Sequence, residues 1–191
     1  MQFDAEYYER YYTDPETCAA SSEEQARQVA LIAAYLRYLD IPVDTILDVG
    51  CGLGHFLAAC ATHYPEANLT GVEVSEHLCA ELGWTWGSVV DFESPPADLV
   101  ICNDVLAYLE PEDCEVAIEN LGNLTQTALF LHVLTEEDVE ICDIERSDPN
   151  QYLRPAEWYR TRLAEHFVSV GAGLFLKLPL EYPLWQLERA Q

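Results

Sequence analysis

The chain has 191 residues, of which half are hydrophobic, and this is the size and balance of one compact domain. Asp and Glu number 34 against 9 Lys and Arg, so the formal net charge is −25. Because binding to nucleic acid or to an anionic membrane relies on clustered basic side chains, this charge argues against both as partners. Two explanations of the acidic composition stay open: adaptation to high salt, or a cationic substrate.

No segment looks like a membrane span or a signal peptide. The longest nearly unbroken apolar run, Val29 to Leu36, is far shorter than the roughly 20 residues that cross a bilayer. The first residues carry Asp4, Glu6 and Glu9 in place of a basic start and an apolar run. The seven cysteines form no CxxC pair, which favours reduced, mostly buried thiols. We therefore expect a cytoplasmic protein without a metal.

The N-terminal residues predict two helices. Four tyrosines between residues 7 and 12 place aromatic rings along one broad face of a short helix over 5–12. Ser21 and Glu24 form a capping box, and apolar residues at helical spacing then predict a long amphipathic helix over about 22–39. We expect residues 1–40 to form a helical extension or lid on a main domain of residues 41–191, the two making one compact unit.

From residue 45 onward the patterns of strands and helices alternate. Strands are predicted at about 45–49, 68–74, 84–89, 98–102 and 128–134, and helices at 54–63, after Ser75, at 111–121 and at 155–166. This alternation implies crossover connections and an α/β fold with a mainly parallel, doubly wound sheet. The last two strands, 168–170 and 174–178, are separated by only three residues, so this pair must be antiparallel.

A glycine-rich loop is the most informative segment. In ILDVGCGLGHF, residues 46–56, Asp48 ends a strand, and Gly50, Gly52 and Gly54 alternate before a helix. Glycines remove the Cβ atoms that would keep a ligand from the backbone. Glu73, at the end of the next strand, can accept hydrogen bonds from two ribose hydroxyls. Together these residues predict a nucleoside-binding crevice at the carboxyl edge of the sheet.

The spacing of the glycines favours a cofactor without phosphates. A dinucleotide loop reads GxGxxG/A, but the sixth position counted from Gly50 is His55. The acidic Asp48, two residues before the first glycine, would repel a pyrophosphate but can accept a hydrogen bond from an amino group. We therefore expect the cofactor to carry an ammonium group.

The segments DVGCGLG, GVEVS and DLVICNDVLAYL, in this order and spacing, resemble the class I S-adenosylmethionine-dependent methyltransferases over roughly residues 44–178. The resemblance implies a seven-stranded sheet of order 3-2-1-4-5-7-6 with an antiparallel seventh strand, and S-adenosyl-L-methionine as the cofactor. The cofactor-binding residues that it implies are Asp48 near the amino group, Gly50, Cys51, Gly52 and Gly54 along the methionine part, Glu73 and Val74 at the ribose, Val90 and Asp91 at the adenine, and Asn103 between the methionine and the substrate.

Methyl transfer from a sulfonium is an in-line displacement that depends on orientation and on the exclusion of water, so a catalytic base is optional. If the acceptor is a hydroxyl or a carbon acid, His132 near the end of the fifth strand is the best placed base. The alternative for His132 is a histidine that is only hydrogen-bonded at a strand end. Tyr8 and Tyr12 either contact the cofactor or the acceptor, or only pack the extension onto the sheet.

The acceptor side is the least determined by the sequence. The long polar stretch from Thr135 to Arg160 is a candidate acceptor region, with Tyr152, Arg154 and Trp158 as tentative substrate residues. The expected activity is methylation of a small molecule, since the charge disfavours nucleic acid and CNDV differs from the D/N-P-P-Y signature of amino-directed DNA methyltransferases. Two alternatives remain: an aminopropyltransferase-like group transferase, for which no paired-aspartate signature is present, and a non-catalytic protein that uses the fold as a partner surface.

Overall fold

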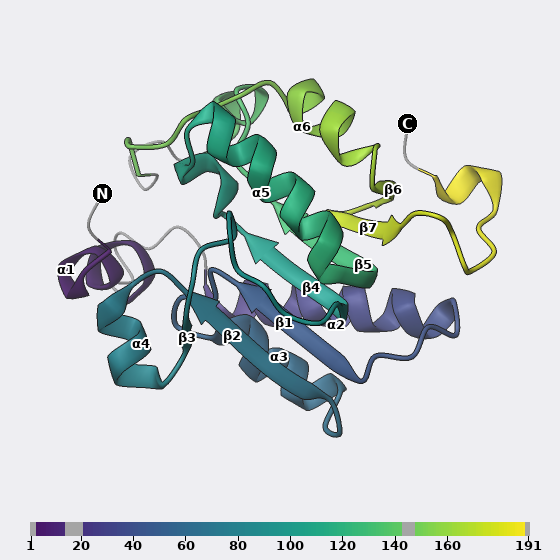
Figure 1. Ribbon diagram of the computed structural model, residues 1–191, viewed down its shortest axis with the longest axis horizontal. Helices are drawn as coiled ribbons and strands as arrows, with labels where there is room; N and C mark the ends of the chain where they lie inside the picture. Colours follow the sequence, from purple (N-terminus) through teal and green to yellow (C-terminus); the bar gives the residue numbers. More distant parts are fainter. Residues whose placement is uncertain (1–2, 14–20, 143–147, 190–191) are drawn as a thin grey trace.

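The computed structural model describes residues 3–13, 21–142 and 148–189 (Figure 1). A seven-stranded sheet crosses the molecule in the order β3-β2-β1-β4-β5-β7-β6. Its strands are β1 (Thr45–Val49), β2 (Asn68–Glu73), β3 (Thr85–Trp86), β4 (Ala97–Asn103), β5 (Thr125–His132), β6 (Phe167–Gly171) and β7 (Leu174–Lys177). The first five strands pair in parallel, and β7 is antiparallel to both β5 and β6. The expected fold class, strand order and terminal hairpin are thus confirmed.

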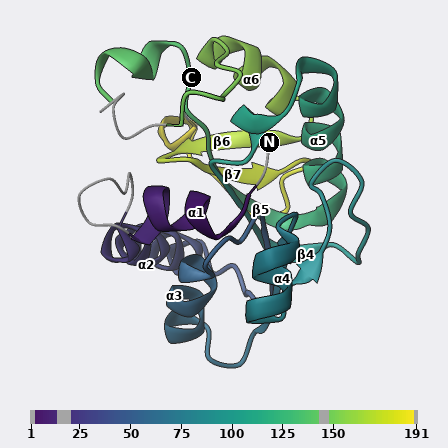
Figure 2. The same cartoon turned by 90° about the vertical axis from the view of Figure 1, so that its left-hand side faces the viewer.

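Helices cover both faces of the sheet. They are α1 (Ala5–Tyr8), continued by a π-helix (Glu9–Thr13), then α2 (Ser22–Tyr38), α3 (His55–His63), α4 (Glu76–Leu82), α5 (Pro111–Leu124) and α6 (Ala156–Leu163), with short 3-10 turns at Leu106–Tyr108, Glu137–Glu140 and Gln186–Glu188. Helices α2 and α3 lie on one face and α5 on the other (Figure 2). Helix α1 lies at the edge toward which the arrows of β2 and β4 point (Figure 1), which is the carboxyl edge of the parallel strands.

Local signals in the sequence explain where the helices begin. Ser21 Oγ accepts a hydrogen bond from the Glu24 backbone N–H at 3.2 Å, and Ser75 Oγ accepts one from Leu78 at 3.3 Å. Pro111 opens α5, where its missing N–H costs no hydrogen bond. These signals set the residues at which α2, α4 and α5 begin.

Two hydrophobic clusters form the core, one on each face of the sheet. Helix α2 contributes Val29, Ile32 and Leu36, which are at most 1% exposed and pack with Ile46 and Phe130 of the sheet. Because alternate residues of a strand point to opposite faces, the neighbours of these strand residues pack against α5 and α6 on the other face. The amphipathic α2 is therefore part of the same core as the sheet.

Most strands differ from their predicted bounds by a residue at one or both ends, and two differ by more. The expected strand 84–89 is reduced to Thr85–Trp86, because the backbone N–H of Phe92 bonds the carbonyl of Ser88 and turns the chain. Val89 is buried in that turn rather than in a strand. The fifth strand begins at Thr125 instead of residue 128, directly after α5 ends.

Among the described residues, no helix has the length and apolar character that a membrane span requires, and no group of three or more His, Cys, Asp or Glu side chains is arranged to hold a metal ion. Cys18 lies outside the described residues, and the six other cysteines are free thiols. Burial raises the pKa of the Cys60 thiol to about 12 and that of Cys114 to about 11, so these thiols stay protonated and unreactive.

We expect Gly71→Ala to lower the free energy of unfolding by about 1–3 kcal/mol. A methyl group there would lie 2.8 Å from Cε3 of Trp84 and 2.9 Å from Sγ of Cys51, behind the glycine loop. Chemical denaturation measures the change. The control is Thr70→Ala on the same strand, whose side chain is exposed and whose loss should cost less than about 1 kcal/mol. Equal stability of the two variants would contradict this packing.

Candidate active site

The loop between β1 and α3 needs its glycines for two physical reasons. Gly50, Gly52 and Gly54 all have positive φ, at 78°, 50° and 77°, where L-residues with a Cβ are strained. A Cβ on Gly50 would also lie 2.3 Å from Val105, and one on Gly54 would lie 2.5 Å from the ring of Trp84. Around Gly52 there is room, since its nearest neighbour would be a Tyr8 ring carbon at 3.9 Å. The loop therefore presents bare backbone at Gly52, held in place by packing at Gly50 and Gly54.

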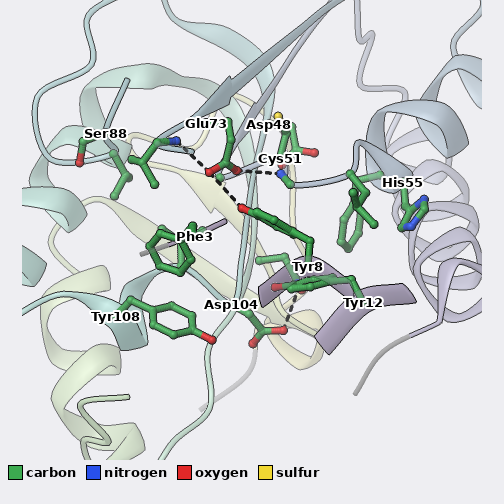
Figure 3. Close-up of a pocket in the computed structure, with 18 of the residues that line it drawn as sticks. Phe3, Tyr8, Tyr12, Asp48, Cys51, His55, Glu73, Ser88, Asp104 and Tyr108 are labelled. Atoms are coloured by element: carbon green, nitrogen blue, oxygen red, sulfur yellow. Dashed lines mark hydrogen bonds between the residues drawn. The ribbon is translucent and has the colours of Figure 1, made fainter. Parts of the chain in front are cut away.

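Glu73 ties this loop to the end of β2. Its Oε2 accepts the backbone N–H of Gly52 at 2.9 Å, and its Oε1 accepts those of Val74 and Ser75, also at 2.9 Å. The Tyr8 hydroxyl donates to the same Oε1 at 3.4 Å. Glu73 is 3% exposed, so three backbone donors compensate for its desolvation. The carboxylate is fixed with one side turned to the cavity (Figure 3).

Asp48, at the carboxyl end of β1, is a buried acid without a cation. It is 2% exposed, and its Oδ2 has no hydrogen-bond partner among the described residues. Burial and the nearby charge of Glu73 raise the pKa of Asp48 to about 8. A buried, unpaired carboxyl oxygen is costly unless a ligand supplies a donor. A ligand ammonium is such a donor.

These two acids line one cavity of about 300 Å³. Its lining also includes Phe3, Tyr7, Tyr8, Tyr12 and Gln25 from the N-terminal helices, Gly50, Cys51, Gly52, His55 and Val74 near the loop, Gly87, Ser88 and Val89 after β3, and Asn103, Asp104, Val105 and Tyr108 after β4. No Lys or Arg is among the lining residues that the structure describes. The interior therefore favours a ligand with a positive charge and apolar parts.

Five aromatic residues line this cavity and are here called the aromatic lid: Phe3, Tyr7, Tyr8, Tyr12 and Tyr108. Figure 3 labels four of them, Phe3, Tyr8, Tyr12 and Tyr108. The hydroxyls of Tyr7 and Tyr108 are 2.8 Å apart, and the Ser75 hydroxyl donates to the Phe3 carbonyl at 2.6 Å. Burial raises the pKa values of these tyrosines, that of Tyr108 to about 12. The lid therefore supplies neutral hydroxyl donors.

The structure brings most of the expected cofactor residues together. Asp48, Gly50, Cys51, Gly52, Glu73, Val74, Asn103, Tyr8 and Tyr12 all line the cavity, while Gly54 shapes the loop from behind. Val90 and the exposed Asp91 are not part of the lining, and Ser88 and Val89 occupy that side. The register differs because the chain turns at Ser88, directly after the short β3.

The expected acceptor residues lie elsewhere. His132 lines a second cavity beside the first. Arg154 is 6% exposed and donates to the backbone carbonyls of Leu106 and Leu109, so it holds the turn after β4. Trp158 packs against the Arg162 guanidinium at 3.8 Å, and Tyr152 is exposed. Tyr152, Arg154 and Trp158 therefore line neither of these two cavities.

Sequence reasoning missed several site residues. The indole N–H of Trp84 donates to the Gly52 carbonyl at 2.9 Å and so supports the loop. Asp104, directly after Asn103, lines both cavities with a φ of 55°. Tyr7 and Tyr108 were detectable only as aromatic residues, because nothing in the sequence shows that their elements meet.

Comparison with known proteins agrees with this geometry. Residues 47–127 match the family model of a methyltransferase domain, and the strand order is the one that the class I resemblance implied. Over these residues the chain is similar to a methyltransferase domain, and its sheet has the class I methyltransferase fold. A malonyl-[acyl-carrier protein] O-methyltransferase from Legionella pneumophila is 34% identical over 85 residues, covering 38% of this chain. The chain spans only 30% of the length of that relative.

Solved structures share this fold. Magnesium protoporphyrin IX methyltransferase from Synechocystis PCC 6803, with bound SAM (S-adenosylmethionine), superimposes with a TM-score of 0.57 and 19% identity over 82% of each chain. The PH0226 protein from Pyrococcus horikoshii OT3 gives a TM-score of 0.61 and 16% identity over 91% of this chain and 97% of that one.

We expect Asp48→Asn to stabilise the protein, increasingly so as the pH rises. Because the pKa of Asp48 is raised from 3.8 to about 8, the folded state keeps a proton that the unfolded chain releases between these values. Stability is therefore lost as the pH rises through this range, and the amide variant avoids that loss. Melting temperatures measure it, each kcal/mol being worth roughly 2–4 °C. If the difference in melting temperature between variant and parent does not grow from about pH 4 to pH 8, Asp48 does not have the raised pKa that its burial implies.

Proposed function

We propose that the protein is a methyltransferase that uses S-adenosylmethionine and acts on a small molecule. The observation that carries the proposal is the pair of buried acids in one cavity: Asp48, with an unpartnered oxygen, and Glu73, fixed by three backbone donors. An ammonium and a ribose diol are the groups that such carboxylates bind. A nucleoside that carries an amino acid and no phosphate has both.

Each part of the cavity has a role in this proposal. Asp48 binds the ammonium, Glu73 accepts from the ribose hydroxyls, and Ser88 and Val89 border the adenine. Tyr8, which already donates to Glu73 at 3.4 Å, closes the ribose side. The acidic interior also suits a sulfonium cation, since the lining residues that the structure describes include no competing Lys or Arg.

The bound cofactor would supply an electrophilic methyl group on sulfur. The chain's own residues would then orient the reactants and exclude water, which are the main sources of rate in such a displacement. The glycine loop and Glu73 fix one reactant, and the aromatic lid closes over it. Solved methyltransferases of this fold with bound SAM, at 19–21% identity, support this choice of ligand without establishing it.

An aminopropyltransferase-like activity is the second candidate. The specific observation in its favour is that no described Lys or Arg lines the cavity to pair with the carboxylate of a methionine moiety. Side-chain donors in the lining, Gln25, Tyr12 and His55 among them, are available for that carboxylate. A decarboxylated cofactor would need none of them.

Isothermal titration calorimetry with S-adenosylmethionine, S-adenosylhomocysteine and decarboxylated S-adenosylmethionine tests the choice. We expect the first two to bind, and Glu73→Gln to weaken both by at least about tenfold, since loss of a hydrogen bond to a charged group costs roughly 1.5–3 kcal/mol. Glu93→Gln removes the same charge from an exposed side chain and should bind like the parent. Tightest binding of the decarboxylated compound would favour aminopropyl transfer, and binding of none of the three would favour a non-catalytic protein.

Cofactor affinity should also depend on pH. A ligand ammonium requires the Asp48 carboxylate, whereas a pKa of about 8 keeps this group protonated near neutrality. Binding therefore releases a proton, and the dissociation constant should fall by up to about tenfold per unit from pH 6 to 7.5, below the usual α-amino pKa. Calorimetry in two buffers with different ionisation heats counts the proton. Asp48→Asn should bind the cofactor more weakly, release no proton on binding, and show no such pH dependence of the dissociation constant. The same pH dependence in this variant as in the parent would exclude Asp48 as the group that releases the proton.

A further inference from the structure

A second cavity lies directly beside the first. It measures about 650 Å³ and lies between α2, the ends of β4 and β5, and α6. Gln25, Asn103 and Asp104 line both cavities, so these three residues form a shared wall. A molecule in the second cavity would therefore lie next to the contents of the first, at these three residues. This inference rests on the proposed function, which places the cofactor in the first cavity.

The shared wall offers hydrogen-bond acceptors and negative charge. Asp104 is its one ionisable side chain, and Gln25 and Asn103 are amides. Elsewhere in the lining, Glu24 and Asp138 add acids, while the described residues contribute one fixed cation, Arg160, whose side chain is 64% exposed and lies 4.0 Å from Glu157. A carboxylate or phosphate would be repelled at this wall, and a protonated amine attracted.

His132 is poorly placed to act as the base here. The Gln28 amide nitrogen lies 3.4 Å from its Nδ1, within hydrogen-bond distance. The ring lies 4.6 Å from the centre of the Phe130 ring, and Gly173 is so close that a Cβ there would lie 2.4 Å from Nε2. One ring nitrogen thus has Gln28 as a neighbour, and the other lies close to the Gly173 backbone. This arrangement favours the alternative in which His132 is only a hydrogen-bonded residue at the end of a strand.

Asp104 has the better geometry. Its backbone N–H donates to the His132 carbonyl at 2.9 Å, and its Oδ2 accepts from the Asn103 amide at 3.0 Å, so the carboxyl group is fixed on the shared wall. Burial raises the pKa of Asp104, while His132 and Asn103 counteract the rise. The other titratable groups that interact with Asp104 are Tyr12 from the π-helix, Tyr108 from the turn after β4, Cys102 of β4, and Cys142. Their pKa values are all raised, so they are neutral near pH 7.

We propose that the second cavity binds the methyl acceptor, that the acceptor is an amine, and that Asp104 takes its proton. An ammonium group transfers one proton to the Asp104 carboxylate and becomes a free amine. The nitrogen lone pair forms the new N–C bond as the S–CH3 bond breaks, and the electron pair of that bond stays on sulfur. The products are a neutral thioether and a methylated ammonium, and Asp104 later returns its proton to solvent.

The experiment compares matched acceptors with the full chain. The probes are 2-phenylethylamine, cyclohexylamine and putrescine, and their counterparts 2-phenylethanol, cyclohexanol and 1,4-butanediol, each tested for release of S-adenosylhomocysteine. We expect turnover of at least one amine and of none of the hydroxyl compounds. Turnover confined to hydroxyl compounds, or absent from all six, would overturn the proposal. Calorimetric binding of S-adenosylmethionine is measured first, so that failure of the cofactor site is distinguished from failure of the acceptor site.

Variants then test the role of Asp104. Asp104→Asn should lower kcat for the amine by at least about 100-fold, the typical contribution of a general base. Its affinity for S-adenosylmethionine should stay within about threefold, since it keeps the Asn103 contact. In the parent, kcat/KM should fall at low pH as Asp104 becomes protonated, and Asp104→Glu, which keeps a carboxylate, should retain this acid limb.

Asp113→Asn is the matched control, because it removes one charge from an exposed side chain on α5 and should leave turnover unchanged. A structural role for Asp104 would lower the melting temperature and the turnover of both the Asn and the Glu variants without altering the pH profile. Normal amine turnover by a folded Asp104→Asn protein would exclude Asp104 as the base.

Discussion

The carboxylate of Glu73 is the contact on which the site depends. It accepts three backbone N–H groups, from Gly52, Val74 and Ser75, and a fourth hydrogen bond from Tyr8. These donors belong to the glycine loop, the end of β2 and the N-terminal helix, which are distant in the sequence. A single buried carboxylate thereby joins three segments of the chain. The same group lines the cavity, so in the proposed function structure and ligand binding share one side chain.

Asp48 makes the site unfavourable in the absence of a ligand. A second acid beside Glu73 is held without a cation, and burial together with like charge keeps it protonated near neutrality. The folded chain thus carries an unfavourable interaction that a cationic ligand relieves. Such local destabilisation is typical of functional sites, where groups are arranged for a ligand rather than for the stability of the free protein. The excess of acidic residues over the whole chain strengthens the same electrostatic preference.

Much of the fold was predictable, because it follows from local patterns. The alternation of strands and helices gave the parallel sheet, and three residues between the last strands required the hairpin. Asp48 and Glu73 were predictable because strand ends meet at one edge. The position of Asp91 could not be predicted in the same way, because it depends on where β3 ends. This strand has only two residues, both exposed, and so gives a weak signal in the sequence. Trp84 and Asp104 act through contacts across the fold, which no spacing in the sequence encodes. The sequence assignments at the cavity remain predictions until binding is measured.

Helix α2 packs into the core with one set of residues and lines the two cavities with another. Val29, Ile32 and Leu36 anchor it in the core, whereas Gln25, in its first turn, lies on the wall between the cavities. If the second cavity binds the acceptor as we propose, substitutions in this first turn would alter which acceptor is chosen, while the anchoring face three or more residues further along keeps the helix in the core. Acceptor choice and stability would then depend on different parts of one helix.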